Sequence, residues 1–167
     1  MTVPAATTRS TRSTVEADRG RATMSRALGV DVGTVRVGLA TSDPGRIVAT
    51  PLDTLDAGDA NAEDWAERLA ARLAEVAESQ GCDVVVVGLP KSLSGRDSAS
   101  TRTARAVASA LERLGVDVAL WDERLSSAEA ERLLIGAGRR REQRRGERDA
   151  VAATLILQGW LDAQGGA

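Results

Sequence analysis

A chain of 167 residues is long enough to bury one hydrophobic core and too short for two full-sized domains, so we expect a single active site. The absence of histidine excludes an imidazole general base, a Ser-His pair and a His-ligated zinc, and leaves acid-base or metal chemistry mostly to carboxylates. The net charge of -2 does not by itself indicate a nucleic-acid binder.

Features that the sequence lacks also exclude several classes of protein. No stretch approaches the ~20 apolar residues of a membrane span, and no secretory signal follows Met1, so we expect a cytoplasmic protein with no membrane partner. The lone Cys82 excludes an internal disulfide and is expected to pack as a small hydrophobe. Because Phe and Tyr are absent, base-stacking platforms are disfavoured, and any nucleic-acid contact should be mainly to phosphates.

The N-terminal residues differ in composition from the rest. Residues 1–26 are rich in Thr, Ser, Ala and Arg and have no hydrophobic period, which predicts a disordered extension, and Met24 is an alternative start. We expect one domain over 27–163 and a short tail over 164–167.

The first part of the domain predicts strands and then a helix. From Ala27 the sequence ALGVDVGTVRVGLATSD predicts a hairpin of two strands broken at Gly33 and Thr34. A third strand is expected over 47–50. Residues 61–79 place apolar side chains on one helical stripe that ends before a glycine, which predicts an amphipathic helix.

The second part predicts alternating strands and helices. Residues 84–87 are apolar without alternation, as in a central parallel strand covered on both faces. A helix over 98–114 and a strand over 116–121 should follow. The capping-box spacing of Ser126 and Glu129 predicts a short helix to 135, and the last helix, 147–162, is apolar nearly all round and should be largely buried. The order predicts a single α/β domain whose mixed central sheet combines antiparallel hairpin strands with parallel strands and is flanked by helices.

Asp31 is the first candidate functional carboxylate. It lies in LGVDVG, within a predicted strand whose other members are apolar, where an unpaired charge is costly unless a partner or a cation neutralises it. The alternative is a turn aspartate that binds backbone amides near Gly33. This residue alone leaves both interpretations open.

Glu123 is the second candidate. It follows the strand predicted over 116–121, at the carboxyl edge where ligands of open α/β sheets gather. Asp122 is its close competitor. Either acid also fits an ion pair with Arg124 or the start of a helix.

Asp149 is the third candidate, because it shares a helical stripe with the apolar residues at 153, 156 and 160. Its alternative role is to cap the first turn of that helix. Three carboxylates that converge without a histidine are suited to Mg²⁺ or Mn²⁺. Two such ions about 4 Å apart activate a water and stabilise the leaving oxygen in phosphodiester cleavage.

A basic segment precedes the last helix. Six arginines lie in GRRREQRRGERD, residues 138–149, and form a local patch in an acidic chain. The alternative is a solvated basic loop.

The range from Ala27 to Asp162 resembles the YqgF or RuvX family of Holliday-junction-resolvase-like proteins, regarded as candidate pre-16S rRNA nucleases. The resemblance rests on GVDVGTVRVGLA, VVVVGLP with its glycine-containing loop, WDERLSSAEAERLL and DAVAATLILQGWLD, in the family's order. It implies an RNase H-like fold, and it carries over Asp31, Glu123 and Asp149 as the acidic, metal-binding and catalytic triad.

The resemblance also implies substrate contacts and a task. Arg36 and Arg124 match family positions and would contact substrate phosphates, and the loop 88–95 would border the substrate. The full set of expected substrate-binding residues is Arg36, Arg124, Lys91, Ser92, Arg139, Arg140 and Arg141. The implied task is trimming the 5′ end of precursor 16S rRNA in the cytoplasm. Apart from the resemblance, we expect nucleic acid and ribosomal particles as partners, and the oligomeric alternatives are a monomer and a homodimer.

Rival functions are compatible with parts of this sequence. Holliday junction cleavage is the older proposal for the family. DVGTVRVG also resembles the first phosphate loop of actin-like ATPases and sugar kinases, but those enzymes use two domains around a cleft. A non-catalytic RNA-binding or ribosome-binding module would bind RNA with salt-dependent affinity and cleave nothing.

Overall fold

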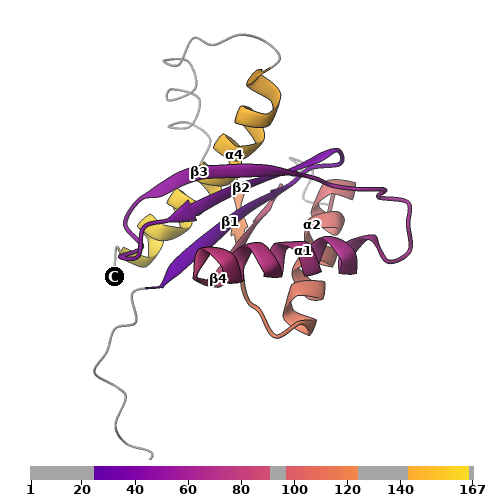
Figure 1. Cartoon of the computed structure of the whole chain (residues 1–167). Coiled ribbons are helices and arrows are strands. Elements are labelled where there is room, and N and C mark those ends of the chain that lie inside the picture. The colour runs from indigo at the N-terminus through magenta and orange to yellow at the C-terminus, as the bar shows by residue number, and fades with distance from the viewer. Residues whose placement is uncertain (1–24, 91–96, 124–142, 166–167) are drawn as a thin grey trace, which may run out of the picture.

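The computed structural model describes residues 25–90, 97–123 and 143–165 (Figure 1). The elements, in chain order, are β1 (Arg26–Val32), β2 (Arg36–Ser42), β3 (Ala49–Asp56), α1 (Trp65–Gln80), β4 (Cys82–Leu89), α2 (Ala99–Arg113), β5 (Asp117–Asp122) and α4 (Gln143–Gly165). No helix within these ranges has the length and apolar content that a membrane span requires.

The strands form one five-stranded sheet in the order β3-β2-β1-β4-β5. β2 is antiparallel to both β1 and β3, whereas β4 is parallel to both β1 and β5. The predicted mixed sheet is therefore confirmed, and so is the prediction that 84–87 form an interior parallel strand.

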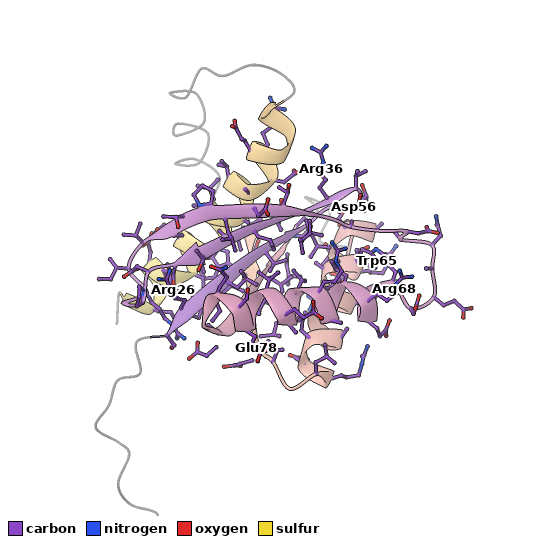
Figure 2. The ribbon with its side chains drawn as sticks, viewed as in Figure 1. Arg26, Arg36, Asp56, Trp65, Arg68 and Glu78 are labelled. Carbon is purple, nitrogen blue, oxygen red and sulfur yellow. The ribbon has the colours of Figure 1, made fainter. Side chains whose placement is uncertain are left out.

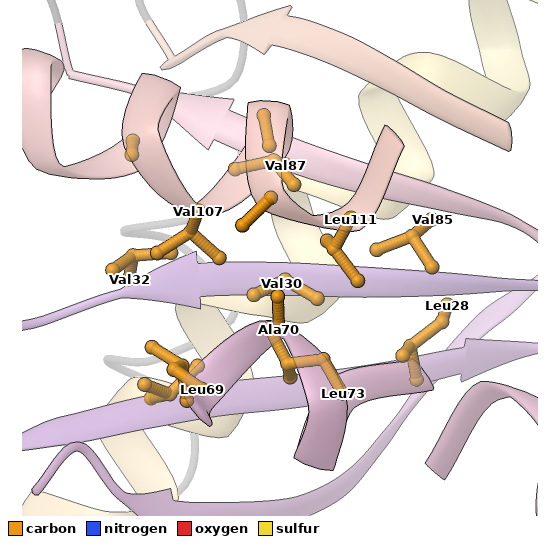
Figure 3. Packing of buried hydrophobic residues seen from close by; sticks show 14 of the residues in the cluster. Leu28, Val30, Val32, Leu69, Ala70, Leu73, Val85, Val87, Val107 and Leu111 are labelled. Atoms are coloured by element: carbon orange, nitrogen blue, oxygen red, sulfur yellow. The ribbon is translucent and has the colours of Figure 1, made fainter. Parts of the chain in front are cut away.

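Helices cover both faces of the sheet. α1 and α2 lie on one face and α4 lies on the other (Figure 1). Side chains of β1 alternate between the two faces. Leu28, Val30 and Val32 join the larger core, where β1 and β4 pack against α1 and α2 (Figure 3).

A smaller core lies under α4 and contains small residues such as Ala27 and Ala40. Every residue of α4 from 150 to 161 is buried or half-buried, which confirms that the last helix is largely buried. The small side chains beneath it allow the helix to lie close to the sheet.

Capping accounts for the ends of α1 and α2. α1 ends at Gln80 and is capped by Gly81, whose φ of 67° is the left-handed conformation that glycine adopts without strain. α2 begins after Ser98, whose side chain accepts a hydrogen bond from the backbone N–H of Thr101. Both helices agree with the predicted ones to within a few residues.

The third strand differs from its prediction, because it spans Ala49–Asp56 and not 47–50. Ile47 and Val48, which prompted the prediction, are 70% and 52% exposed in the loop before it. β3 is an edge strand and contains Pro51, so it lacks the apolar pattern of a half-buried strand.

The ends of the domain also differ slightly from expectation. β1 begins at Arg26, whose backbone N–H donates to the carbonyl of Gly81, so this residue belongs to the sheet and not to the extension expected over 1–26. α4 runs over Gln143–Gly165 and enters the tail expected over 164–167. The short helix predicted from Ser126 lies outside the described residues.

Candidate active site at the carboxyl edge of the sheet

Asp31 lies near the end of β1 and points to the face covered by α4. In the β1–β2 ladder it is paired with Gly38, and the apolar residues Val30 and Val32 beside it point to the opposite face. Burial and then the charge of Asp149 raise the pKa of the Asp31 carboxyl from 3.8 to about 6. The carboxylate therefore occupies a position where a positive charge would stabilise it.

Asp149 reaches the same place from α4. Its backbone lies against β2 at Gly38, so closely that a Cβ on Gly38 would be 1.8 Å from the Asp149 carbonyl oxygen. Since Gly38 is the ladder partner of Asp31, this contact brings the two aspartates together. Asp149 is the seventh residue of α4 as described, beyond its first turn, so the alternative role as a cap of that turn does not hold.

Glu123 directly follows β5. Its Oε1 atom is buried and lies 2.9 Å from the point that a Cβ on Gly88 would occupy. Burial first, and then the charges of Asp31 and Asp122, raise the pKa of Glu123 from 4.5 to about 7. Glu123 is thus electrostatically coupled to Asp31, as Asp149 is.

The three acids come from strands and a helix that are far apart in sequence, and Asp31 is the member coupled to both others. Among the described residues, no group of three His, Cys, Asp or Glu side chains is already arranged to hold a metal ion. The donor chemistry nevertheless fits a hard divalent cation, because buried carboxylates that repel one another lose that repulsion when a cation binds.

Arg36 lies at the start of β2, at the end of the sheet where β1 terminates. It is exposed, and its guanidinium makes no hydrogen bond or ion pair with the described residues. Figure 2 shows it at the opposite end of the sheet from Arg26. The other expected substrate contacts lie outside the described residues, namely Lys91, Ser92, Arg124, Arg139, Arg140 and Arg141.

Sequence reasoning missed three glycines beneath α4. Gly29, Gly38 and Gly88 lie within strands, and each faces α4 at a distance that leaves no room for a Cβ. Glycine inside a strand often marks a close backbone approach, so a usable signal was present. Only the position of α4 explains the three glycines together.

A comparison with family models identifies the family of this chain. The RuvX family model, described as Holliday junction resolvase, matches residues 25–163. The chain belongs to the RuvX family. A protein of Mycobacterium sp. (strain KMS) is 43% identical over 149 residues, covering 88% of this chain and 83% of the relative. One of Anaeromyxobacter sp. (strain K) is 45% identical over 142 residues, covering 82% and 96%. Both relatives are named as candidate pre-16S rRNA nucleases.

Solved structures show the fold of this RuvX family member. Thermus thermophilus RuvC in complex with a Holliday junction substrate superposes with a TM-score of 0.56 at 20% identity, covering 86% of this chain and 98% of that one. The yeast mitochondrial Holliday junction resolvase gives a TM-score of 0.57 at 15% identity, covering 85% and 80%. At this identity the likeness concerns the fold alone, and it confirms the expected RNase H-like architecture.

Proposed function

We propose that this chain is a metal-dependent nuclease that hydrolyses phosphodiester bonds at the 5′ end of precursor 16S rRNA. The observation that carries the proposal is the electrostatic coupling of three carboxylates at one edge of the sheet. The charge of Asp149 raises the pKa of Asp31, and the charge of Asp31 raises the pKa of Glu123. Family membership and the names of the relatives support nuclease activity and the RNA substrate.

Asp31, Glu123 and Asp149 would hold Mg²⁺ or Mn²⁺. The bound cations would supply Lewis acidity, which activates a water and stabilises the leaving oxygen. Burial of Asp31 and Glu123 removes competing solvent and strengthens every charge interaction in the site. In the protein without metal, a Glu123 carboxyl with a pKa of about 7 holds a proton for much of the time at neutral pH. A cation that binds there has to displace this proton.

The substrate is proposed to follow the arginines around this edge. Arg36 is exposed and has no described partner, so its guanidinium is available to a phosphate oxygen. Sequence resemblance adds Lys91, Ser92 and Arg124 to the proposed contacts, and the basic segment adds Arg139, Arg140 and Arg141. Contacts of this kind bind phosphates without reading base sequence, so the choice of cleavage site would depend on RNA structure.

Holliday junction cleavage is the second candidate, favoured by the description of the family model and by the RuvC-like fold. We rank it lower because the relatives at 43% and 45% identity are named for pre-16S rRNA, whereas the compared resolvases are at most 20% identical. We further propose that the protein acts in the cytoplasm, on ribosomal particles, as a monomer or homodimer.

The deciding experiment compares wild type with Asp149→Asn on two labelled substrates, an RNA spanning the 5′ end of precursor 16S rRNA and a four-way DNA junction. Asp162→Asn is the matched control, because this exposed residue lies at the far end of the same helix. Each protein is assayed with Mg²⁺, with Mn²⁺ and with EDTA.

We expect metal-dependent RNA cleavage that falls by about 100-fold or more in folded Asp149→Asn and is unchanged in Asp162→Asn. RNA binding without cleavage by wild type would establish the binding-module alternative instead. Cleavage of the junction alone would make junction resolution the function.

A further inference from the structure

Gly38 is the point where α4 rests directly on the sheet. A Cβ at this position would lie 1.8 Å from the carbonyl oxygen of Asp149, 2.2 Å from its carbonyl carbon and 3.0 Å from the backbone nitrogen of Ala150. All of these are backbone atoms of a helix, so no side-chain rotation relieves the clash. Any side chain on Gly38 therefore has to move α4 or β2.

The same contact sets the position of a carboxylate. Asp31 and Gly38 are paired across the antiparallel strands, and paired residues present their side chains to the same face of a sheet. The Asp31 carboxylate thus emerges beside the place where the backbone of Asp149 rests. A shift of this turn of α4 away from the sheet would carry the Asp149 carboxylate away from Asp31.

We propose that Gly38 is a positioning residue, which lets α4 approach β2 to the depth that places the Asp149 carboxylate beside Asp31. The inference rests on the proposed function where it concerns metal binding and cleavage. The relative position of the two carboxylates is a property of the protein itself and can be tested without either.

Gly29 supplies a matched control on the same face of the sheet. A Cβ there would lie 2.7 Å from the Cβ of Leu157 and 2.8 Å from the carbonyl oxygen of Ala153. Leu157 and Ala153 lie about 12 Å and about 6 Å further along α4 than Asp149, respectively, at a rise of 1.5 Å per residue. Gly29→Ala therefore disturbs the same helix at a distance from the acids.

The substitution Gly38→Ala has to open the contact from 1.8 Å to at least 3.0 Å. A glutamate at position 149 lengthens the side chain by one C–C bond of about 1.5 Å, which is similar to that displacement. We therefore expect Asp149→Glu to lower cleavage and Mn²⁺ binding in the wild-type background. In the Gly38→Ala background the same substitution should partly restore both. A merely structural role for Gly38 predicts no such rescue.

The experiment measures RNA cleavage and the rise in Tm caused by Mn²⁺ for wild type, Gly38→Ala, Asp149→Glu and the double variant. We expect each single substitution to lower cleavage by about 10-fold or more and to reduce the Mn²⁺ effect, and the double variant to exceed both singles. Adding Asp149→Glu to the Gly29→Ala variant should restore neither cleavage nor the rise in Tm caused by Mn²⁺. Additive losses in the double variant would overturn the inference.

If wild type neither binds Mn²⁺ nor cleaves RNA, that result refutes the proposed function and leaves the inference on Gly38 untouched. Crystal structures of wild type and Gly38→Ala without metal then test the inference directly. An Asp149 carboxylate that stays in place beside Asp31 in Gly38→Ala would overturn the inference. If Gly38→Ala does not fold, Ala150→Val lifts the same turn of α4 from a residue that is 6% exposed. Rescue of that variant by Asp149→Glu is then expected, and its absence would count against the inference.

Discussion

Glu123 lies over Gly88, with its Oε1 atom 2.9 Å from the point where a Cβ of residue 88 would stand. The nearest atom to that point is the Cδ1 of Ile156, at 2.4 Å. A methyl group at position 88 would therefore clash with the flexible end of the Ile156 side chain and with the Glu123 carboxylate. We expect Gly88→Ala to destabilise the protein by about 1–3 kcal/mol through overpacking, and to lower cleavage by about 10-fold through the displaced Glu123.

A second substitution separates these two effects. Ile156→Val removes the Cδ1 atom, so the double variant Gly88→Ala/Ile156→Val should regain stability in urea unfolding while its cleavage rate stays low. Ile156→Val alone, which costs about 0.5–1.5 kcal/mol, is the control. Recovery of cleavage together with stability would mean that Gly88 serves packing only.

The pKa of Asp31 predicts how stability changes with pH. Folding raises this pKa from 3.8 to about 6, so the folded state binds the proton more tightly than the unfolded state. The resulting stabilisation is complete below about pH 4 and is lost as pH rises through 6. In EDTA, Asp31→Asn should gain stability relative to wild type between pH 4 and pH 8, by about 1–3 kcal/mol.

Urea unfolding of both proteins at pH 4 and pH 8 measures this difference. Asp53→Asn, which removes an exposed acid on edge strand β3, is the matched control for the loss of one carboxylate. A difference between Asp31→Asn and wild type that is equal at both pH values would contradict the pKa assigned to Asp31.

Divalent cations should reverse the loss of stability at high pH. A ligand that binds only the folded state raises stability, by about 2.7 kcal/mol when its concentration is 100 times Kd. Because the cation competes with protons on Asp31 and Glu123, whose pKa values are about 6 and about 7, its effect should be larger at pH 8 than at pH 5.5. Thermal melts with Mn²⁺ and with EDTA test this, and an equal effect at both pH values would argue against a site built from these acids.

Hydrophobic period and glycine punctuation predicted most of the fold, because β1, β4, α1 and α2 bury faces with regular spacing. β3 was misplaced because an edge strand needs little apolar surface, so Pro51 and Asp53 give no strand pattern. Local patterns predict elements well where burial is regular. Such patterns give no information on an edge strand, which is held in the sheet by backbone hydrogen bonds to its one neighbouring strand.

The candidate site was predictable in its acids and not in its geometry. Asp31 and Asp149 attract notice because each is a charge in an otherwise apolar pattern. Their meeting depends on the β1–β2 register and on the contact between α4 and Gly38. The second of these joins residues more than a hundred positions apart in sequence. A glycine inside a strand has several causes, so the sequence alone does not indicate that Gly38 lies beneath a helix.

Arg36 should contribute to substrate binding without contributing to stability. It is exposed, and its guanidinium has no described partner, so Arg36→Ala should leave Tm within about 1–2 °C of wild type while raising KM for RNA. If it contacts one phosphate, the slope of log affinity against log salt should fall by about 1. Arg113→Ala is the control, because this arginine pairs with Glu67 on the α1–α2 face, and exposed pairs of this kind contribute little to stability. Filter binding of the RNA over a salt series measures the slopes, and an unchanged slope in Arg36→Ala would place the substrate elsewhere on the protein.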